Sequence, residues 1–192
     1  MIYFSFMSNR NRTLLTDYSC FFTTTACYDH LHLLARQENM NILIDQISYY
    51  LEKYHAELLG YVLMPNHIHL INFFKEYNYL SDFMRGVKRY SSKLIANEIE
   101  HHQPELIPNI LYKHRKQNKK IWDDRFHDEV IYSTKFLVQK LNYIHKNPCQ
   151  PYWHLVEKPE DYKYSSALFY LTGEAGVLPV THYAEYFSIP VR

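Results

Sequence analysis

Two apolar runs separated by a Pro-Asn pair constrain the fold of this chain more than any other feature. Residues 58–64, LLGYVLM, and residues 67–74, HIHLINFF, each have the length and apolar character of a β-strand. Pro65 and Asn66 between them are typical of a tight turn. The sequence therefore predicts a buried β-hairpin near the centre of the chain.

Further strands and helices are expected on either side of this hairpin. Aromatic and β-branched residues predict strands at residues 18–28 and about 126–132. Apolar residues at helical spacing predict helices at about 36–57, 80–98 and 134–146. The resulting order is strand, helix, strand, strand, helix, strand, helix. This order favours an α+β fold, with a ferredoxin-like antiparallel sheet and helices packed on one face.

Composition limits the class of protein. The chain has 192 residues, 47% of them hydrophobic, which is enough for one core. We expect one domain over residues 1–172 and a C-terminal tail of unknown role over residues 173–192. Three cysteines without metal-ligand spacing fit a reducing compartment, and no stretch approaches the roughly 20 apolar residues that span a bilayer. A cytoplasmic protein with no membrane partner is therefore expected.

The first candidate for chemistry is the His-Ile-His sequence that begins the second strand of the hairpin. His67 and His69 are separated by one residue, so on a strand both side chains leave the same face. Two imidazoles on one face can share a divalent cation. The same spacing also occurs in pairs of solvent-facing histidines with no ligand, and the pattern alone leaves both possibilities open.

The second candidate lies on the predicted helix that ends in LNYIHKNP. Tyr143 and Asn147 are four residues apart and therefore share a helix face, which also carries Lys140. A tyrosine there could present its hydroxyl at the rim of a cleft, and the asparagine could offer an amide oxygen to a metal. In a chain with 19 tyrosines, however, composition and spacing alone favour a tyrosine at the edge of the core and an asparagine that ends the helix.

The third candidate is a set of basic residues in a chain whose net charge is only +1. Such clusters can bind phosphate groups, although a solvated charged loop has the same composition. One cluster lies on the predicted helix 80–98 and another lies within residues 113–120. The candidate phosphate contacts, including two from other segments, are Lys88, Arg89, Lys113, Arg115, Lys116, Arg125 and Lys140.

Four ordered blocks of sequence resemble the REP-associated tyrosine transposases, which belong to the single-tyrosine HUH transposases of insertion sequences (IS200-like). The blocks are GYVLMPNHIHLI, IWDDRFHDEVI, YIHKNP and DYKYSSALFY. The resemblance runs from about residue 18 to about residue 170. It implies an HUH transposase domain over the single domain described above.

This resemblance assigns roles to residues already identified. The two HUH histidines fall on His67 and His69. The nucleophile of the family precedes the Asn-Pro dipeptide on its helix, which corresponds to Tyr143, and the third metal ligand one turn later corresponds to Asn147. Tyr90 is the rival nucleophile, but the family pattern favours Tyr143. Arg125 matches a recurring arginine, with a structural role or a contact to the DNA backbone.

The resemblance also implies an activity. Such an enzyme cuts and rejoins single-stranded DNA at REP-like hairpins, through a 5′-phosphotyrosine intermediate and with Mg²⁺ or Mn²⁺ as cofactor. The expected partner is single-stranded DNA with palindromic hairpins, and the protein is expected to be a monomer or a homodimer. The main alternative is a domesticated protein that binds the hairpin without cleaving it. A metal-dependent hydrolase of another substrate and a small α/β protein with a structural histidine pair are further alternatives.

Overall fold

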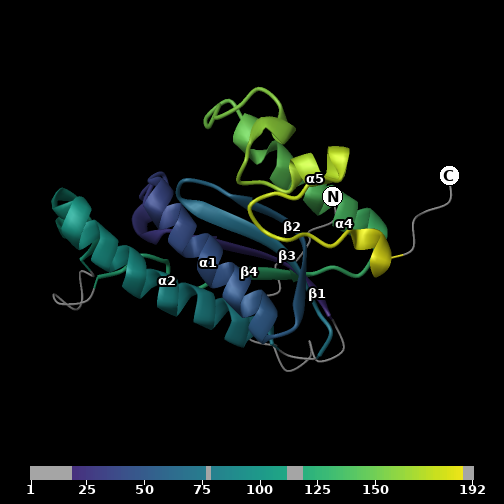
Figure 1. The fold of residues 1–192 in the computed structure, drawn as a ribbon, viewed down its shortest axis with the longest axis horizontal. Coiled ribbons are helices and arrows are strands. Elements are labelled where there is room, and N and C mark those ends of the chain that lie inside the picture. Colours follow the sequence, from purple (N-terminus) through teal and green to yellow (C-terminus); the bar gives the residue numbers. More distant parts are fainter. Residues whose placement is uncertain (1–18, 77–78, 112–118, 188–192) are drawn as a thin grey trace, which may run out of the picture.

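The protein folds into one four-stranded antiparallel sheet covered by helices. The computed structural model describes residues 19–76, 79–111 and 119–187. The strands are β1 (Cys20–Ala26), β2 (Ala56–Leu63), β3 (His67–Phe74) and β4 (His127–Val130). The longer helices are α1 (Gln37–Lys53), α2 (Leu80–His102) and α4 (Thr134–Lys146), and the shorter ones are α3 (Ile107–Ile110) and α5 (Ala167–Thr172) (Figure 1).

The strand order confirms the expected ferredoxin-like class. The sheet has the order β2-β3-β1-β4, and every neighbouring pair is antiparallel. The predicted hairpin is the β2–β3 pair, and β3 begins and ends at the expected residues. The helices α1 and α2 connect β1 to β2 and β3 to β4 and pack together on one face of the sheet (Figure 1).

The strands carry apolar residues on both faces because the opposite face is also covered. Ile68 and Leu70 of β3 belong to the apolar cluster beneath α1 and α2. Ile71, with the opposite orientation, belongs to a second cluster together with Leu141 and Ile144 of α4. In addition to the two helices on the expected face, α4 therefore packs on the other face of the sheet.

Local features fix the position of α4. The Ser133 side chain caps its first turn, because Oγ accepts a hydrogen bond from the Phe136 amide at 3.3 Å. Pro148 follows the helix in a short 3₁₀ turn. Beneath the helix, β2 has an irregular register between Leu58 and Gly60, and the missing side chain of Gly60 leaves room for Leu141. These features set α4 close against the sheet.

The segment after residue 172 contacts the outer edge of β2. The Thr181 amide donates to the Leu58 carbonyl at 3.0 Å, and Leu178 is buried beside Tyr61. Two earlier backbone bonds reach the same strand, from Ser166 to the Tyr61 carbonyl and from Leu63 to the Tyr164 carbonyl. The domain boundary at residue 172 stays a prediction, although residues 174–187 pack on the domain that precedes them. In the described ranges no helix is both long and apolar enough to cross a membrane.

Candidate active site

His67 and His69 lie side by side at the start of β3, on the face covered by α4. Their ring centroids are 4.9 Å apart. His69 is buried, with 4% of its surface exposed, and Ile68 between them points to the opposite core. The expected placement of both imidazoles on one face of a strand is confirmed. The alternative of a solvent-facing pair does not fit the burial of His69.

Each imidazole is held through one ring nitrogen. The Nδ1 atom of His69 is 2.7 Å from the Thr24 hydroxyl, and Nδ1 of His67 is 2.7 Å from the side-chain oxygen of Asn66. Both Nε2 atoms are thus left for another partner. The Nε2 atom of His69 is buried and has no hydrogen-bond partner in the described structure. An outer hydrogen bond that fixes the ring while the other nitrogen stays available is the usual arrangement of a metal-ligating histidine.

Both histidines are neutral at physiological pH. Burial lowers the pKa of His69 to about 3, and repulsion of the protonated ring by a protonated His67 and by Lys140 acts in the same direction. Burial lowers the pKa of His67 to about 4, with a smaller contribution from His30. A neutral imidazole keeps the lone pair that metal coordination requires.

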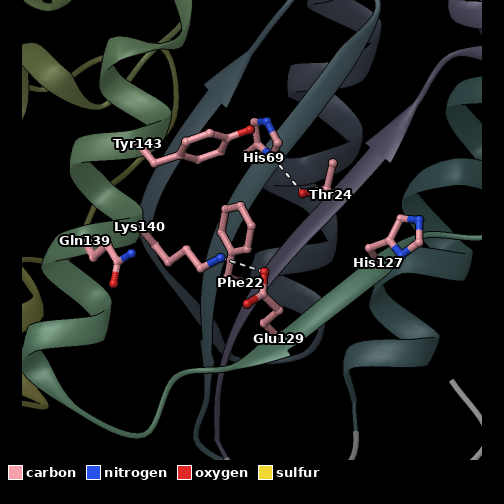
Figure 2. Close-up of a pocket in the computed structure, with 8 residues that line it drawn as sticks. All are labelled: Phe22, Thr24, His69, His127, Glu129, Gln139, Lys140 and Tyr143. Atoms are coloured by element: carbon pink, nitrogen blue, oxygen red, sulfur yellow. Dashed lines mark hydrogen bonds and ion pairs between the residues drawn. The ribbon is translucent and has the colours of Figure 1, made fainter. Parts of the chain in front are cut away.

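Tyr143 of α4 faces this pair across the site. Its ring lies edge-on to His69, with centroids 5.4 Å apart, and 53% of its surface is exposed. Figure 2 shows the side chain extending from α4 toward His69. Burial raises the pKa of Tyr143, and Tyr152 and Glu129 add to the effect, so the phenol is protonated at neutral pH. The hydroxyl is accessible but needs help to become a nucleophile.

Asn147, the residue that ends α4 one turn after Tyr143, is the third expected ligand. The residue is buried at the end of the helix, and its side-chain oxygen has no hydrogen-bond partner in the described structure. Trp153, in the turn beyond the helix, lies with its ring centroid 5.8 Å from that of His67.

Imidazole nitrogens and an amide oxygen are donor types that can bind a divalent cation. Within the described residues no three His, Cys, Asp or Glu side chains gather as metal ligands. A cation held here would therefore need the amide oxygen of Asn147 beside the Nε2 atoms of His67 and His69. Two of these three atoms, in His69 and Asn147, are buried without a partner. Such orphaned groups are costly unless a ligand satisfies them.

A pocket of about 330 Å³ opens beside Tyr143, between α4 and strands β1 and β4. Lys140 crosses it from α4: its ammonium donates to Glu129 of β4 at 2.6 Å and lies 4.4 Å from the centroid of the Phe22 ring (Figure 2). The residues that line the pocket are Phe22, Thr24, His69, His127, Glu129, Gln139, Lys140 and Tyr143.

The other predicted residues are distributed more widely. The Lys88 ammonium donates to the backbone carbonyl of Asp123 at 2.7 Å, and burial lowers its pKa to about 8. This geometry ties α2 to the segment before β4, so a phosphate contact by Lys88 stays a prediction. Arg89 and Arg125 are exposed. Lys113, Arg115 and Lys116 lie outside the described residues.

The rival nucleophile does not share this site. Tyr90 is exposed on α2, and its ring lies 6.1 Å from that of Tyr50, which belongs to the apolar cluster on the opposite face of the sheet. The sheet therefore separates Tyr90 from the face that carries His69.

Several site residues were not identified from the sequence, among them Phe22, His127, Glu129 and Gln139 of the pocket and three residues that contact the histidines. Thr24 reaches His69 because the two are register partners in the β1–β3 pair, and Trp153 reaches His67 through the turn after α4. Both contacts depend on tertiary structure. Asn66 gave a usable signal, since it directly precedes His67, but its only apparent role was in the turn.

Comparisons with known proteins agree with this architecture. The family model of the IS200-like transposases matches residues 33–147. A solved structure of a REP-associated tyrosine transposase bound to a REP hairpin is similar with a TM-score of 0.62 and 20% sequence identity, over 85% of this chain and 86% of that chain. A candidate transposase from Deinococcus radiodurans gives a TM-score of 0.45 and 17% identity, over 67% of this chain and 90% of that chain. Curated protein sequences gave no match.

Proposed function

The chain belongs to the family of IS200-like transposases, and we propose that it cuts and rejoins single-stranded DNA through a covalent bond to Tyr143. The observation that carries this proposal is the contact between the rings of Tyr143 and His69, whose centroids are 5.4 Å apart. This contact sets the exposed Tyr143 side chain, with its hydroxyl, beside an imidazole whose Nε2 atom has no hydrogen-bond partner in the described structure. A nucleophile next to a ligand for an electrophilic cation is the arrangement that phosphodiester transfer requires.

The proposed metal ligands are His67, His69 and Asn147. Mg²⁺ or Mn²⁺ held by them would polarise the scissile phosphate and take up the charge that develops on it. Imidazole and amide ligands are neutral, so they do not reduce the positive charge at the site. Thr24 and Asn66 hold the two rings in the orientation that ligation needs.

In the proposed reaction, the Tyr143 oxygen attacks phosphorus. A bond forms between the tyrosine oxygen and the 5′-phosphate, and the bond from phosphorus to the 3′-oxygen breaks. The phenol proton leaves and the departing 3′-oxygen becomes a hydroxyl. A second 3′-hydroxyl reverses the step and rejoins the strand, so no nucleotide cofactor is needed. Lys140, whose ammonium lines the same pocket, can favour the ionised form of the phenol.

We further propose that the substrate is an imperfect DNA hairpin. The solved structure that shares this fold holds a REP hairpin. Arg89 and Arg125 are candidates for contacts with the DNA backbone. Lys88 and Lys140 are weaker candidates, because backbone carbonyls already engage the first ammonium and Glu129 the second. A protein that only binds the hairpin would have no use for two orphaned donor atoms beside an exposed tyrosine.

The test is the formation of a covalent adduct. The protein is incubated with Mn²⁺ and single-stranded palindromes from the DNA flanking its gene, and the products are separated on a denaturing gel. We expect an adduct with the wild type and none with Tyr143→Phe or His67→Ala, while Tyr90→Phe keeps it. An adduct that survives Tyr143→Phe contradicts the assigned nucleophile. Binding without any adduct, across metals and sequences, supports the domesticated binder instead.

A further inference from the structure

The pocket beside Tyr143 extends beyond the residues that the proposed cleavage uses. The scissile phosphate would approach Tyr143 and His69, which form only one side of it. The remaining side is built by α4 and β4, through Lys140, Glu129 and His127. The cleavage step described above gives no role to Glu129 or His127, nor to the space that they border.

The walls of the pocket have the chemistry of a nucleobase site. Its inner part is aromatic: the Phe22 ring stacks on His69 with centroids 5.4 Å apart, and Tyr143 meets Phe22 edge-on at 6.2 Å. Its outer part is polar: the Glu129 carboxylate is half exposed, and Lys140 holds it at 2.6 Å (Figure 2). Proteins hold unpaired bases by apolar or aromatic contact with the ring and hydrogen bonds to its edge.

Glu129 is an unexpected residue in this position if the pocket only held the DNA backbone. A carboxylate near a phosphodiester repels it, and the partly neutralised Lys140 is then a poorer phosphate contact. A carboxylate does, however, accept hydrogen bonds from base amino groups. The ion pair fixes the carboxylate between β4 and α4, so its orientation is set before DNA binds.

We propose that this pocket receives the unpaired base that borders the scissile phosphate, and that Glu129 reads the edge of that base. The inference rests on the proposed function, because it takes Tyr143 as the point where the phosphate lies. The base on one side of that phosphate is within one nucleotide of Tyr143, and the pocket begins at the same residue. Lys140 acts as the positioning residue for Glu129.

The chemistry also predicts a preference. A carboxylate only accepts hydrogen bonds, so it favours adenine, cytosine and guanine, each of which has an exocyclic amino group. Thymine presents two carbonyl oxygens on the corresponding edge and a single N–H between them. Thymine is therefore the base that the pocket holds least well.

The test measures DNA binding by Tyr143→Phe, which keeps the aromatic ring but cannot form an adduct. The probes are hairpin oligonucleotides from the DNA flanking the gene, with each of the four bases or an abasic site at the two nucleotides that border the cut. If the wild type forms no adduct, the series covers every unpaired nucleotide near the foot of the hairpin. Base discrimination at one nucleotide is expected to be about tenfold, with thymine and the abasic site weakest.

Variants at Glu129 separate base reading from a purely structural ion pair. Adding Glu129→Gln is expected to reduce the discrimination between bases to about twofold or less, whereas Glu129→Asp keeps the order of preference. Glu52→Gln, an exposed position on α1, is the control with the same charge change and leaves the discrimination intact. Release of Lys140 would change the affinity for all probes equally, so the ratio between bases is the decisive quantity.

The proposal is overturned if no unpaired nucleotide shows base discrimination, if Glu129→Gln leaves that discrimination unchanged, or if no probe binds. The ion pair then only fastens β4 to α4. Because binding is measured with a variant that cannot cleave, base discrimination can be found even if the wild type forms no adduct. Failure of the proposed function and failure of the base pocket are thereby distinguished.

Discussion

Adding one methyl group at Gly60 is expected to disable the site without unfolding the protein. A Cβ at Gly60 would overlap the Cδ2 atom of Leu141, and it would lie 3.4 Å from Ile144 Cδ1 and 3.5 Å from Ile71 Cδ1. To restore an ordinary carbon contact, the end of the Leu141 side chain must move by about 1 Å. Leu141 is buried between α4 and the sheet, so we expect the added methyl group to push α4 outward with it, and Tyr143 lies on the same helix.

The expected losses of unfolding free energy and of reaction rate both follow from this displacement. Overpacking a core by one methyl group costs about 1–3 kcal/mol of unfolding free energy. Gly60 does not have a positive φ, so alanine adds no backbone strain there. A displacement of about 1 Å at a reacting group lowers the rate about 100-fold. For Gly60→Ala we therefore expect adduct formation to slow by about 100-fold at a temperature where the variant is folded.

The assay compares the rate of adduct formation at saturating DNA with the unfolding free energy from urea titration. Gly86→Ala is the matched control, because its Cβ would overlap the Tyr50 ring between α1 and α2, on the opposite face. It should lose similar stability but keep the rate. Adding Leu141→Val to Gly60→Ala removes the overlapping atom and should restore most of the rate. The reasoning is refuted if Gly60→Ala cleaves at the wild-type rate, or if Gly86→Ala slows cleavage equally.

Two further predictions concern Thr24 and Lys88. Thr24→Val removes the hydroxyl that holds His69 and should weaken Mn²⁺ affinity, measured by calorimetry, about 10- to 100-fold. Thr25→Val should leave the affinity unchanged, because the Thr25 hydroxyl is buried with no hydrogen-bond partner among the described residues. Equal affinities in both variants would refute the role of Thr24. The pKa of Lys88 is about 8 in the fold, below its ordinary value of 10.5, so the unfolded chain binds more protons between these values. The contribution of Lys88 to stability therefore rises with pH across this window. In urea titrations, the free energy of unfolding of Lys88→Met should exceed that of the wild type by less at pH 10.5 than at pH 8. A difference that stays constant with pH would contradict the burial of a charged ammonium.

The sequence predicted those parts of the site that depend on periodicity within one element. His67 and His69 share a strand face, and Tyr143 and Asn147 share a helix face, because spacing alone determines both relations. Periodicity also located β3 and α4 closely. It could not show that the two faces meet, which depends on α4 packing over the second face of the sheet.

The residues that were missed come from pairings between distant segments. Thr24 lies opposite His69 only because β1 pairs with β3, and Glu129 reaches Lys140 because β4 adds to the outer edge of β1. Neither residue has a distinctive spacing in the sequence. The resemblance to a family supplied the grouping of the histidines, the tyrosine and the asparagine, but it assigned nothing to these two positions.

The contacts along the outer side of β2 limit how copies of this protein can assemble. An edge strand with unpaired amides and carbonyls invites strand addition from another molecule. Here the chain's own later segments occupy that side, through the bonds of Ser166 and Thr181 to β2 carbonyls and of the Leu63 amide to Tyr164. A second copy that extended the sheet at β2 would have to displace them. The same contacts protect this edge from uncontrolled sheet-to-sheet aggregation.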